Sequence, residues 1–298
     1  MKKINLIISA TLFLIIFIYS TLSPAKELTI VYTANSNGKL MYCNCPGDPY
    51  GGLSERVTLI RELRKKEQPF LLVDSGNMVG LFGDYDLKAS CVIRMMNLMK
   101  YNAAAAARNE MFKGIPRALA MSGKAKFPVI SASIADKTEQ KLVFKSYVTR
   151  KISGTTVTIT AVCDSSCFVM GNSMEYDYTT LPVSDTLSGI LNEVSPESDF
   201  IVVLSQMTPD SNIALLRDFP SVDIVVESYG NKKYEPPVTT PNGIIVSPGH
   251  SGQFVGLITI EKSDGKVNIK RSEMIPVLNI PEDKKAHKLV VEYYRKRK

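Results

Sequence analysis

The stretch Leu28–Leu40, LTIVYTANSNGKL, and the cysteine-bearing loop Met41–Leu53 that follows it decide how the rest of the chain is interpreted. Residues Leu28–Tyr32 alternate branched and aromatic side chains, as a buried β-strand does. The small polar residues of Thr33–Gly38 end that strand. In open α/β folds, ligands bind in loops at the carboxyl ends of strands. The same pattern also suits an ordinary strand-to-helix connection, so the later strands have to decide between the two.

The composition is that of a globular protein. The chain has 298 residues, of which 45% are hydrophobic and 22% charged, and this length allows a sizeable core. The formal net charge is +7, and part of it lies in the terminal run Arg295–Lys298, a pattern typical of a solvated helix end. No basic patch is interleaved with aromatic residues, so the composition argues against nucleic-acid binding.

The first 25 residues have the pattern of an export signal. Lys2 and Lys3 precede the apolar run Leu6–Tyr19, which is short for a membrane span, and Ser23–Ala25 places small residues before a cleavage point. We therefore predict a signal peptide over residues 1–25 and export to the periplasm or the extracellular space. The alternative is an uncleaved N-terminal anchor, which is the only case in which we expect contact with a membrane.

Export matters for the cysteines, because close pairs in an oxidising compartment become disulfides or metal ligands. The sequence has five, namely Cys43, Cys45, Cys91, Cys163 and Cys167. A bridge between Cys43 and Cys45 would close a small, strained ring that is easily reduced. Three interpretations stay open: local structural disulfides, a redox or thiol-carrier role, and a single zinc ion held by the two close pairs. Cys91 falls on the apolar stripe of a helix, where we expect a buried free thiol.

Strands and helices alternate in the first half of the chain, and strands dominate the last third. This order favours an α/β sandwich in which two mixed sheets face each other under helices. The expected helices are 54–67, 86–101, 116–121, 185–194, 210–217 and 281–298. The expected strands are 28–32, 70–73, 103–107, 128–133, 142–152, 155–162, 200–205, 222–226, 243–247, 254–261 and 266–271.

The residues that follow these strands resemble one family. The order TANSNG, GGL, DSGN, RNEMFKG, SQM, ESYGN and PGHSGQFVG is similar to that of the amino-terminal domain of the 5′-nucleotidase branch of the calcineurin-like metallophosphoesterases. The resemblance implies a two-sheet α/β/β/α sandwich over residues 26–298, a single domain that ends in the helix 281–298. It also implies hydrolysis of phosphate esters by two metal ions. Larger members of the family carry a second substrate domain, which would begin after this helix.

The chain departs from the family at the metal ligands. The family's carboxylates and imidazoles correspond here to neutral polar side chains, namely Asn35, Asn37, Asn77, Asn109, Gln206, Tyr229 and Asn231. An amide offers one neutral oxygen where a carboxylate offers charge and a bridge, so two dications would lose their charge compensation. The family's Asn-His-Glu turn reads Arg108-Asn109-Glu110, and the chain has two histidines, His250 and His287. We therefore expect no metal and no other cofactor at these positions.

Three functions of different classes remain open. The first is a pseudoenzyme that binds a small polar or anionic ligand, or an exported protein partner, at the vestigial site. The second is a thiol-dependent redox or sulfur-handling protein that uses Cys43 and Cys45, together with Cys163 and Cys167. The third is a phosphoester hydrolase with an atypical catalytic site built from Glu110, His250 and the amides.

Overall fold

Two six-stranded sheets and one small sheet make up the β-structure. The computed structural model describes residues 25–42, 47–67, 69–81, 83–165 and 177–297. The first sheet has the spatial order β14 (Lys266–Pro276), β13 (Phe254–Ser263), β1 (Lys26–Thr33), β2 (Leu71–Asp74), β3 (Ala103–Ala105) and β4 (Val129–Ile130). The second has the order β11 (Val238–Thr239), β12 (Ile244–Val246), β10 (Ile224–Glu227), β9 (Phe200–Gln206), β7 (Thr155–Cys163) and β6 (Tyr147–Ile152). The small sheet pairs β5 (Ile134–Asp136) with β8 (Tyr178–Thr180).

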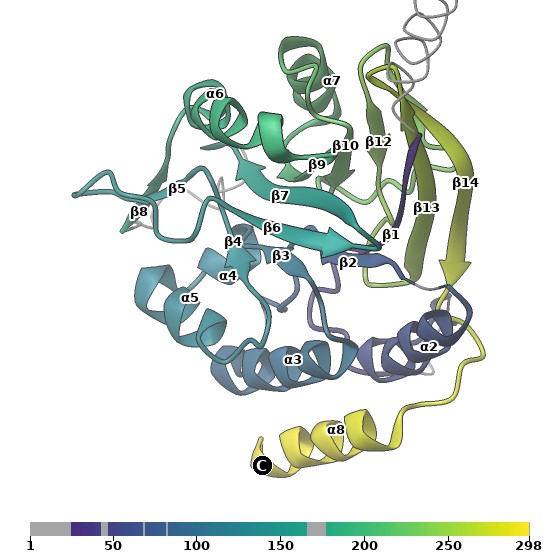
Figure 1. Ribbon diagram of the computed structural model, residues 1–298. Coiled ribbons are helices and arrows are strands. Elements are labelled where there is room, and N and C mark those ends of the chain that lie inside the picture. Colours follow the sequence, from purple (N-terminus) through teal and green to yellow (C-terminus); the bar gives the residue numbers. More distant parts are fainter. Residues whose placement is uncertain (1–24, 43–46, 68, 82, 166–176, 298) are drawn as a thin grey trace, which may run out of the picture.

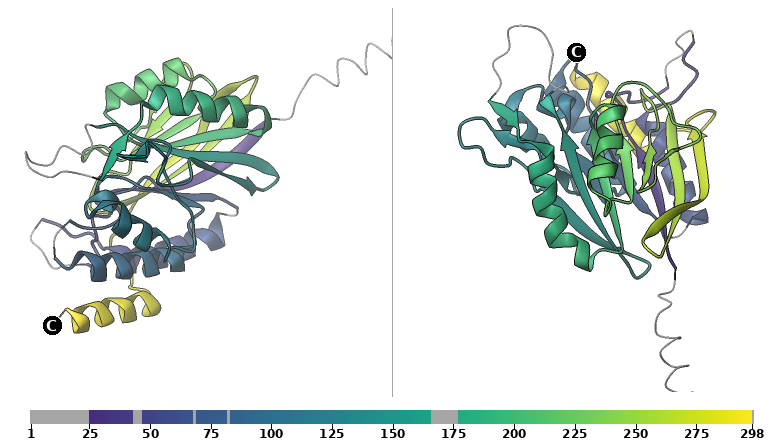
Figure 2. Two further views of the ribbon diagram at one scale, coloured as in Figure 1. Left: turned by 90° about the vertical axis from the view of Figure 1, so that its left-hand side faces the viewer. Right: turned by 90° about the horizontal axis from the view of Figure 1, so that it is seen from above.

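The two large sheets pack face to face, and helices cover their outer faces (Figures 1 and 2). The helices on the side of the first sheet are α2 (Leu53–Lys66), α3 (Tyr85–Met99), α4 (Arg108–Met111), α5 (Gly114–Ser122) and α8 (Lys284–Lys296). Those on the side of the second sheet are α6 (Val183–Val194), the 3₁₀-helix η2 (Ser195–Glu197) and α7 (Pro209–Asp218). This arrangement confirms the predicted α/β/β/α sandwich.

The alternation of side chains along each strand divides the core into layers. In β1, Ile30 and Tyr32 pack between the sheets, whereas Val31 packs under the helices. In β9, Val202 packs between the sheets and Val203 packs under α6 and α7. Successive side chains of a strand point to opposite faces, so continuous apolar runs serve two cores at once.

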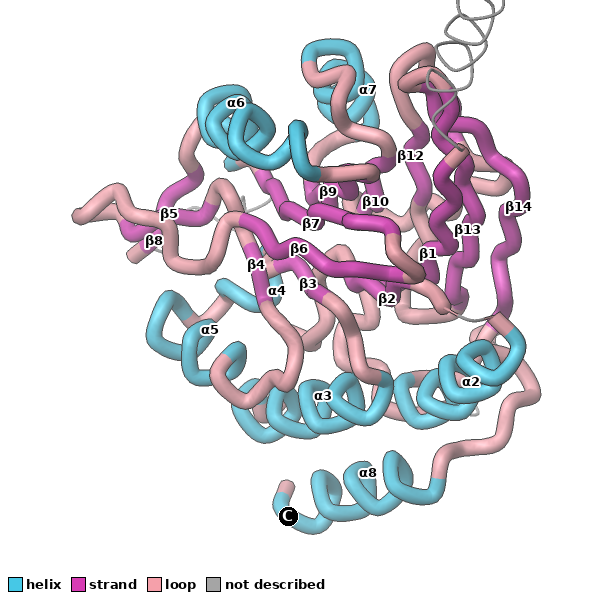
Figure 3. Tube along the Cα trace, in the orientation of Figure 1, coloured by secondary structure: helices cyan, strands magenta, loops and turns pink. Residues whose placement is uncertain are grey.

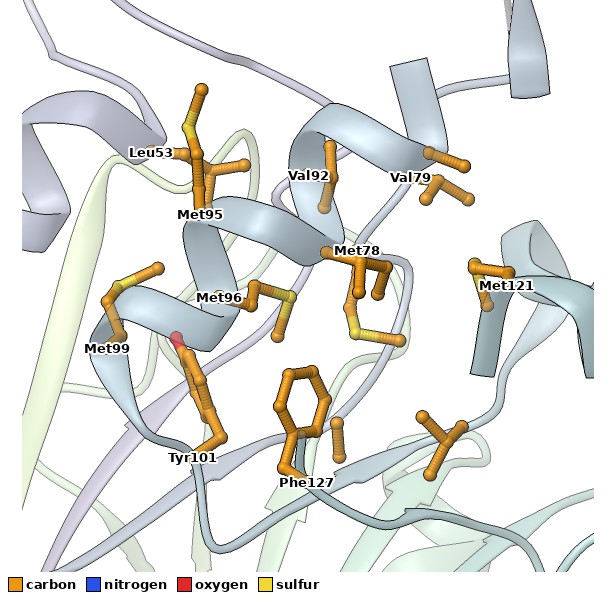
Figure 4. Close-up of a cluster of buried hydrophobic side chains, with 14 of the residues drawn as sticks. Leu53, Met78, Val79, Val92, Met95, Met96, Met99, Tyr101, Met121 and Phe127 are labelled. Carbon is orange, nitrogen blue, oxygen red and sulfur yellow. The ribbon is translucent and has the colours of Figure 1, made fainter. Parts of the chain in front are cut away.

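Helix α3 forms the centre of the core beneath the first sheet. Its Met95, Met96 and Met99 gather with Met78 and other apolar side chains in one buried cluster (Figure 4). The methionine stripe is therefore core packing, as predicted. Cys91 on the same helix is a buried free thiol, and burial raises its pKa to about 11. The prediction for Cys91 is confirmed.

Parallel pairing brings several strand ends to one edge of the sandwich. Strands β1, β2, β3 and β4 are parallel neighbours in the first sheet, and β7, β9, β10 and β12 are parallel neighbours in the second. Loops, drawn in pink in Figure 3, follow these strands. The two sheets meet at these strand ends, since Ser75 after β2 donates through its hydroxyl to the carbonyl of Val226 in β10 at 2.6 Å. This is the edge at which the family resemblance places its site.

Some element boundaries differ from those predicted. The hairpin around Ser153 and Gly154 is present, but β6 begins at Tyr147 because Leu142 bridges Ala135 instead of continuing the strand. Helix α8 begins at Lys284 and not at residue 281, because the side chain of Asp283 caps it by accepting bonds from the backbone of its first turn. The small β5–β8 sheet was not predicted, because its strands are only three residues long.

Helix α8 forms an extra layer outside α2 and α3 (Figures 1 and 2). It buries Ala286, Val290 and Tyr293 in the core beneath the first sheet. Within the described part of the chain, no helix is both long enough and apolar enough to cross a membrane. The predicted signal peptide lies almost wholly outside the described residues.

Candidate functional site

Two adjacent loops form the floor of the site. Asn35 and Asn37 follow β1 and Asn77 follows β2, and all three adopt left-handed backbone conformations with φ of 51°, 48° and 54°. Asparagine tolerates this conformation better than most residues do. The loops pair through their backbones, because the amide of Asn35 donates to the carbonyl of Gly76 at 2.9 Å and that of Asn37 donates to Asn77 at 2.9 Å.

The amide side chains of the site bond to one another. Asn77 Nδ2 donates to Asn35 Oδ1 at 2.9 Å, and Asn77 Oδ1 accepts from the backbone amide of Asn109 at 3.2 Å. Asn109 Nδ2 in turn donates to Asn37 Oδ1 at 2.9 Å. Asn35, Asn77 and Asn109 are buried, with exposures of 3%, 4% and 2%. We call these four side chains, Asn35, Asn37, Asn77 and Asn109, the amide network.

The second sheet closes over this network from the other side. Asn35 Nδ2 donates to the carbonyl of Gly249 at 3.0 Å and lies 3.4 Å from that of Gly230. Gly249 precedes His250, and Gly230 separates Tyr229 from Asn231. The loops that carry the predicted residues of the second sheet therefore reach the amide network through their backbones.

The remaining predicted residues take different places. Gln206 Oε1 accepts from the backbone amide of Arg108 at 2.8 Å, so Gln206 joins the site. Tyr229 and Asn231 are exposed. His250 is half-buried, and its Nδ1 lies 3.1 Å from Ser251 Oγ. Among the described residues, no hydrogen bond links the side chains of Tyr229, Asn231 or His250 to the amide network.

Glu110 is a structural residue of the site. One of its oxygens accepts from the backbone amides of Asn77 and Ala107 at 3.0 and 3.1 Å, and the other accepts from those of Met78 and Val79 at 2.8 and 3.3 Å. A carboxylate has about four acceptor positions, so all of them are taken. Burial raises the pKa of Glu110 to about 7 against the opposing effect of these donors. This geometry argues against Glu110 as a metal ligand or a catalytic base.

Two buried charged residues, Asp74 and Arg56, support the loops through separate hydrogen bonds. Asp74, at the end of β2, accepts from Thr33 Oγ1 at 2.6 Å and from the backbone amide of Gly76 at 2.9 Å. Arg56 on α2 donates to Ser36 Oγ at 2.8 Å and to the carbonyl of Gly252 at 3.2 Å. Burial raises the pKa of Asp74, and the bond from Thr33 and the charge of Arg56 act against that rise. These residues fix the loop between Asn35 and Asn37.

Arg108 is the functional candidate that the sequence analysis did not single out. It begins α4, at the position where the family has the Asn of its Asn-His-Glu turn, and it is half-buried. Within the described residues, its Nε is buried without a hydrogen-bond partner, as is Oδ1 of the neighbouring Asn109. The signal was present in the triplet Arg108-Asn109-Glu110, where a cation replaces a metal ligand.

The two-metal centre of the family does not fit these residues. The side-chain oxygens of Asn35, Asn37 and Asn77 already accept hydrogen bonds from within the site. The described part of the chain contains no group of three or more His, Cys, Asp or Glu side chains that could hold a metal ion. Divalent metals need carboxylate or imidazole ligands with compensating charge, and the amide network supplies neither.

For Cys43, Cys45, Cys163 and Cys167 the sequence left three interpretations open, namely structural disulfides, redox or thiol-carrier chemistry, and a zinc site. Cys163 ends β7 as a buried free thiol, its Sγ lies 3.5 Å from Ser133 Oγ, and burial raises its pKa to about 12. A buried thiol with a raised pKa is unreactive, so the structure argues against Cys163 as a redox residue. Cys43, Cys45 and Cys167 lie outside the described residues, and their pairing stays a prediction.

Comparison with known proteins relates the chain to 5′-nucleotidases. No family model matches the chain. A snake venom 5′-nucleotidase from Crotalus adamanteus is 34% identical over 126 residues, a match that covers 40% of this chain and 21% of the venom protein. Protein UshA from Escherichia coli (strain K12) is 23% identical over 290 residues, which covers 84% of this chain and 52% of UshA. The chain spans about half the length, or less, of these relatives.

Solved structures show the same fold. NAD nucleotidase from Haemophilus influenzae superposes with a TM-score of 0.78 at 18% identity, over 92% of this chain and 61% of the nucleotidase. The calcineurin-like phosphoesterase YfkN from Bacillus subtilis gives a TM-score of 0.72 at 15% identity, over 92% of this chain and 98% of the YfkN chain. The chain has the fold of the calcineurin-like phosphoesterases, and its sequence relatives are 5′-nucleotidases. The resemblance predicted from the sequence is confirmed.

Proposed function

We propose that this chain is an exported protein of the 5′-nucleotidase type that does not hydrolyse phosphate esters through two metals. It binds a small polar or anionic ligand at the amide network instead. The observation that carries the proposal is the set of hydrogen bonds that Asn35, Asn37, Asn77 and Asn109 make with one another. An amide both donates and accepts, whereas an ionised carboxylate only accepts. Substitution of the carboxylates therefore lets the site close without metal ions.

The two orphaned polar atoms support ligand binding at the same place. Arg108 Nε offers a donor on a cation and Asn109 Oδ1 offers an acceptor, and both are buried without a partner in the described residues. A buried polar atom without a partner costs about 1–3 kcal/mol. A small anion with a hydroxyl or amide group would satisfy both atoms. Arginine suits this role because its planar donors match oxyanion geometry.

The first test compares the wild-type protein with a variant in which the family's residues on the loops of the first sheet are restored, while Gln206, Tyr229 and Asn231 stay unchanged. The variant carries Asn35→Asp, Asn37→His, Asn77→Asp, Arg108→Asn and Asn109→His. We expect elemental analysis of the wild type to find no tightly bound metal pair, and nucleotide hydrolysis to stay at background with added Mn²⁺ or Zn²⁺. The restored variant should bind Mn²⁺. Two metals per wild-type chain, with turnover that disappears in His250→Ala, would favour the atypical hydrolase.

The second test concerns the ligand. Calorimetric titration with inorganic phosphate and with acetate should show a binding step that Arg108→Met removes. Arg150, a cation on β6 that is half-buried like Arg108, supplies the matched control Arg150→Met. Equal affinity in the wild type and the Arg108 variant would show that Arg108 does not bind an anion at the amide network.

Export is tested separately by amino-terminal sequencing of the secreted protein, which should begin at Lys26.

A further inference from the structure

A second polar cavity lies apart from the amide network. It has a volume of about 340 Å³ and lies between the loop after β1, helix α3 and helix α8. Small-molecule sites have volumes of about 300–1,000 Å³, so the cavity suits a small ligand. Its charged and aromatic lining consists of Lys39, Asp48, Lys88 and Arg297 with Tyr42, Tyr293 and Tyr294. None of the four asparagines of the amide network lines it.

The cavity has more positive than negative charge. Lys39 is neutralised by Asp48, whose Oδ2 lies 2.6 Å from Lys39 Nζ. In the described part of the chain, no carboxylate lies within ion-pair distance of Lys88 or Arg297. Burial and the nearby charge of Arg297 lower the pKa of Lys88. Lys88 and Arg297 thus lie close enough for their like charges to repel each other, and Arg297 is exposed to solvent.

Two glycines leave room for the Lys88 side chain. A Cβ atom on Gly38 would lie 2.8 Å from Lys88 Cε, and one on Gly80 would lie 3.0 Å from Lys88 Nζ. The end of the lysine side chain therefore lies against the backbone of both glycines. This path brings its ammonium group to the wall of the cavity.

Aromatic rings flank the cations. Tyr294 and Tyr42 are large apolar side chains with exposures of 47% and 43%. Tyr293 is buried beneath Tyr294, with ring centroids 5.1 Å apart at an interplanar angle of 68°. Exposed rings beside a cationic cavity offer a planar ligand apolar area next to its charged group.

We propose that this cavity binds a small aromatic compound that carries a doubly charged oxyanion group, with the anion between Lys88 and Arg297 and the ring against Tyr294 and Tyr42. Lysine contributes a compact charge, and arginine contributes a planar pair of donors. The ligand would supply the negative charge that the cavity lacks. This site does not depend on the function proposed for the amide network.

Calorimetric titration of the full chain with phenyl phosphate, inorganic phosphate and phenol tests the proposal. We expect phenyl phosphate to bind more tightly than inorganic phosphate, and phenol to bind least. Lys88→Met and Arg297→Met should each weaken phenyl phosphate by about tenfold or more, since a charge-assisted bond contributes about 1.5–3 kcal/mol. Arg295→Met, which removes an exposed cation of α8 outside the cavity, should leave the affinity unchanged. Circular dichroism would verify that each variant is folded.

A fluorescence measurement locates the ring. The sequence contains no tryptophan, so Tyr294→Trp introduces a single indole beside the cavity. Its emission should change on titration with phenyl phosphate, and the midpoint of that change should match the affinity measured by calorimetry. Leu119→Trp, at an exposed position on α5, should not respond. Affinity unchanged by Lys88→Met and Arg297→Met would overturn the cavity proposal. Loss of binding in Arg108→Met alone would overturn it too and assign the anion to the amide network.

Discussion

The amide network and the cavity lined by Lys88 and Arg297 share one loop but differ in how their polar groups find partners. Asn37 belongs to the network, and the next two residues, Gly38 and Lys39, line the cavity. In the network, the side-chain amides donate to and accept from one another, although Asn109 Oδ1 stays without a partner among the described residues. In the cavity, Lys88 and Arg297 can only donate, and the carboxylate of Asp48 is paired with Lys39. Amides therefore supply most of their own partners in the folded chain, whereas two cations cannot.

The comparison also explains how a metal site can be lost without collapse. A carboxylate in place of Asn77 would set a second acceptor against Asn35 Oδ1, and a cation, a proton or a turned Asn35 amide would be needed between them. The amide turns that contact into a hydrogen bond. Replacement of several carboxylates together therefore converts a site that needs two dications into one that is stable alone.

The largest effect is expected at Glu110, which anchors the network. Glu110→Ala leaves four backbone amides without an acceptor. At about 1–3 kcal/mol for each buried unsatisfied group, we expect the free energy of unfolding to fall by more than about 3 kcal/mol. Denaturant titration measures it, and Glu139→Ala at an exposed position is the control. A loss as small as the control's would show that solvent replaces the carboxylate.

The free energy of unfolding should change with pH because of the same carboxylate, Glu110. Burial raises the pKa of Glu110 from 4.5 to about 7, so between these values the folded state holds a proton that the unfolded state has released. Stability from this group is present below about pH 4.5 and is lost as the pH rises through about 7. The expected loss is about 3 kcal/mol.

Other buried acids also contribute to the change of the free energy of unfolding with pH, and the test has to separate their contribution from that of Glu110. Burial also raises the pKa of Asp74, Asp223 and Glu227. We therefore expect the difference between the wild type and Glu110→Gln, measured by denaturant titration from pH 5 to 8, to isolate the contribution of Glu110. Parallel pH curves for the two proteins would contradict the prediction.

A smaller loss is expected when one carboxylate is restored. Asn77→Asp replaces the donor to Asn35 Oδ1 by an acceptor and adds charge beside Glu110. We expect the free energy of unfolding to fall by about 1–3 kcal/mol in the presence of a chelator. Asn268→Asp, at an exposed position on β14, should be neutral. Stabilisation of Asn77→Asp without divalent ions would contradict a network that depends on amide donors.

The fold and the first part of the site could be predicted because local patterns encode them. Strand periodicity and the segments TANSNG, DSGN and RNE place Asn35, Asn77 and Asn109 at one edge without knowledge of distant contacts. The side-chain bonds among them could not be predicted, because they depend on the left-handed loop conformations of both strand ends. Glu110 was taken as a catalytic candidate for the same reason, since its four amide partners come from two separate segments.

The cavity could not be predicted from the sequence. It joins Gly38, Lys88 and Arg297, which are far apart in the chain and meet only when α8 packs outside α3. The supporting pair of Arg56 and Asp74 was missed because charged residues are seldom expected inside a core. Tertiary packing, and not local propensity, creates these features.

The smallest effect on stability is expected for a substitution in the cavity. Substitutions in the amide network should lower the free energy of unfolding, whereas this one should leave it unchanged or raise it slightly. Lys88→Met keeps the length and the apolar contacts of the side chain and removes a cation whose pKa burial and Arg297 already lower. Without ligand, the free energy of unfolding should stay within about 0.5 kcal/mol of the wild type or rise slightly. Lys284→Met, at an exposed position on α8, is the control. A loss above about 1 kcal/mol would mean that Lys88 has a structural partner, and the cavity would then resemble the amide network. A neutral result with weakened binding of phenyl phosphate would show that the charge at this position serves the ligand and not the fold.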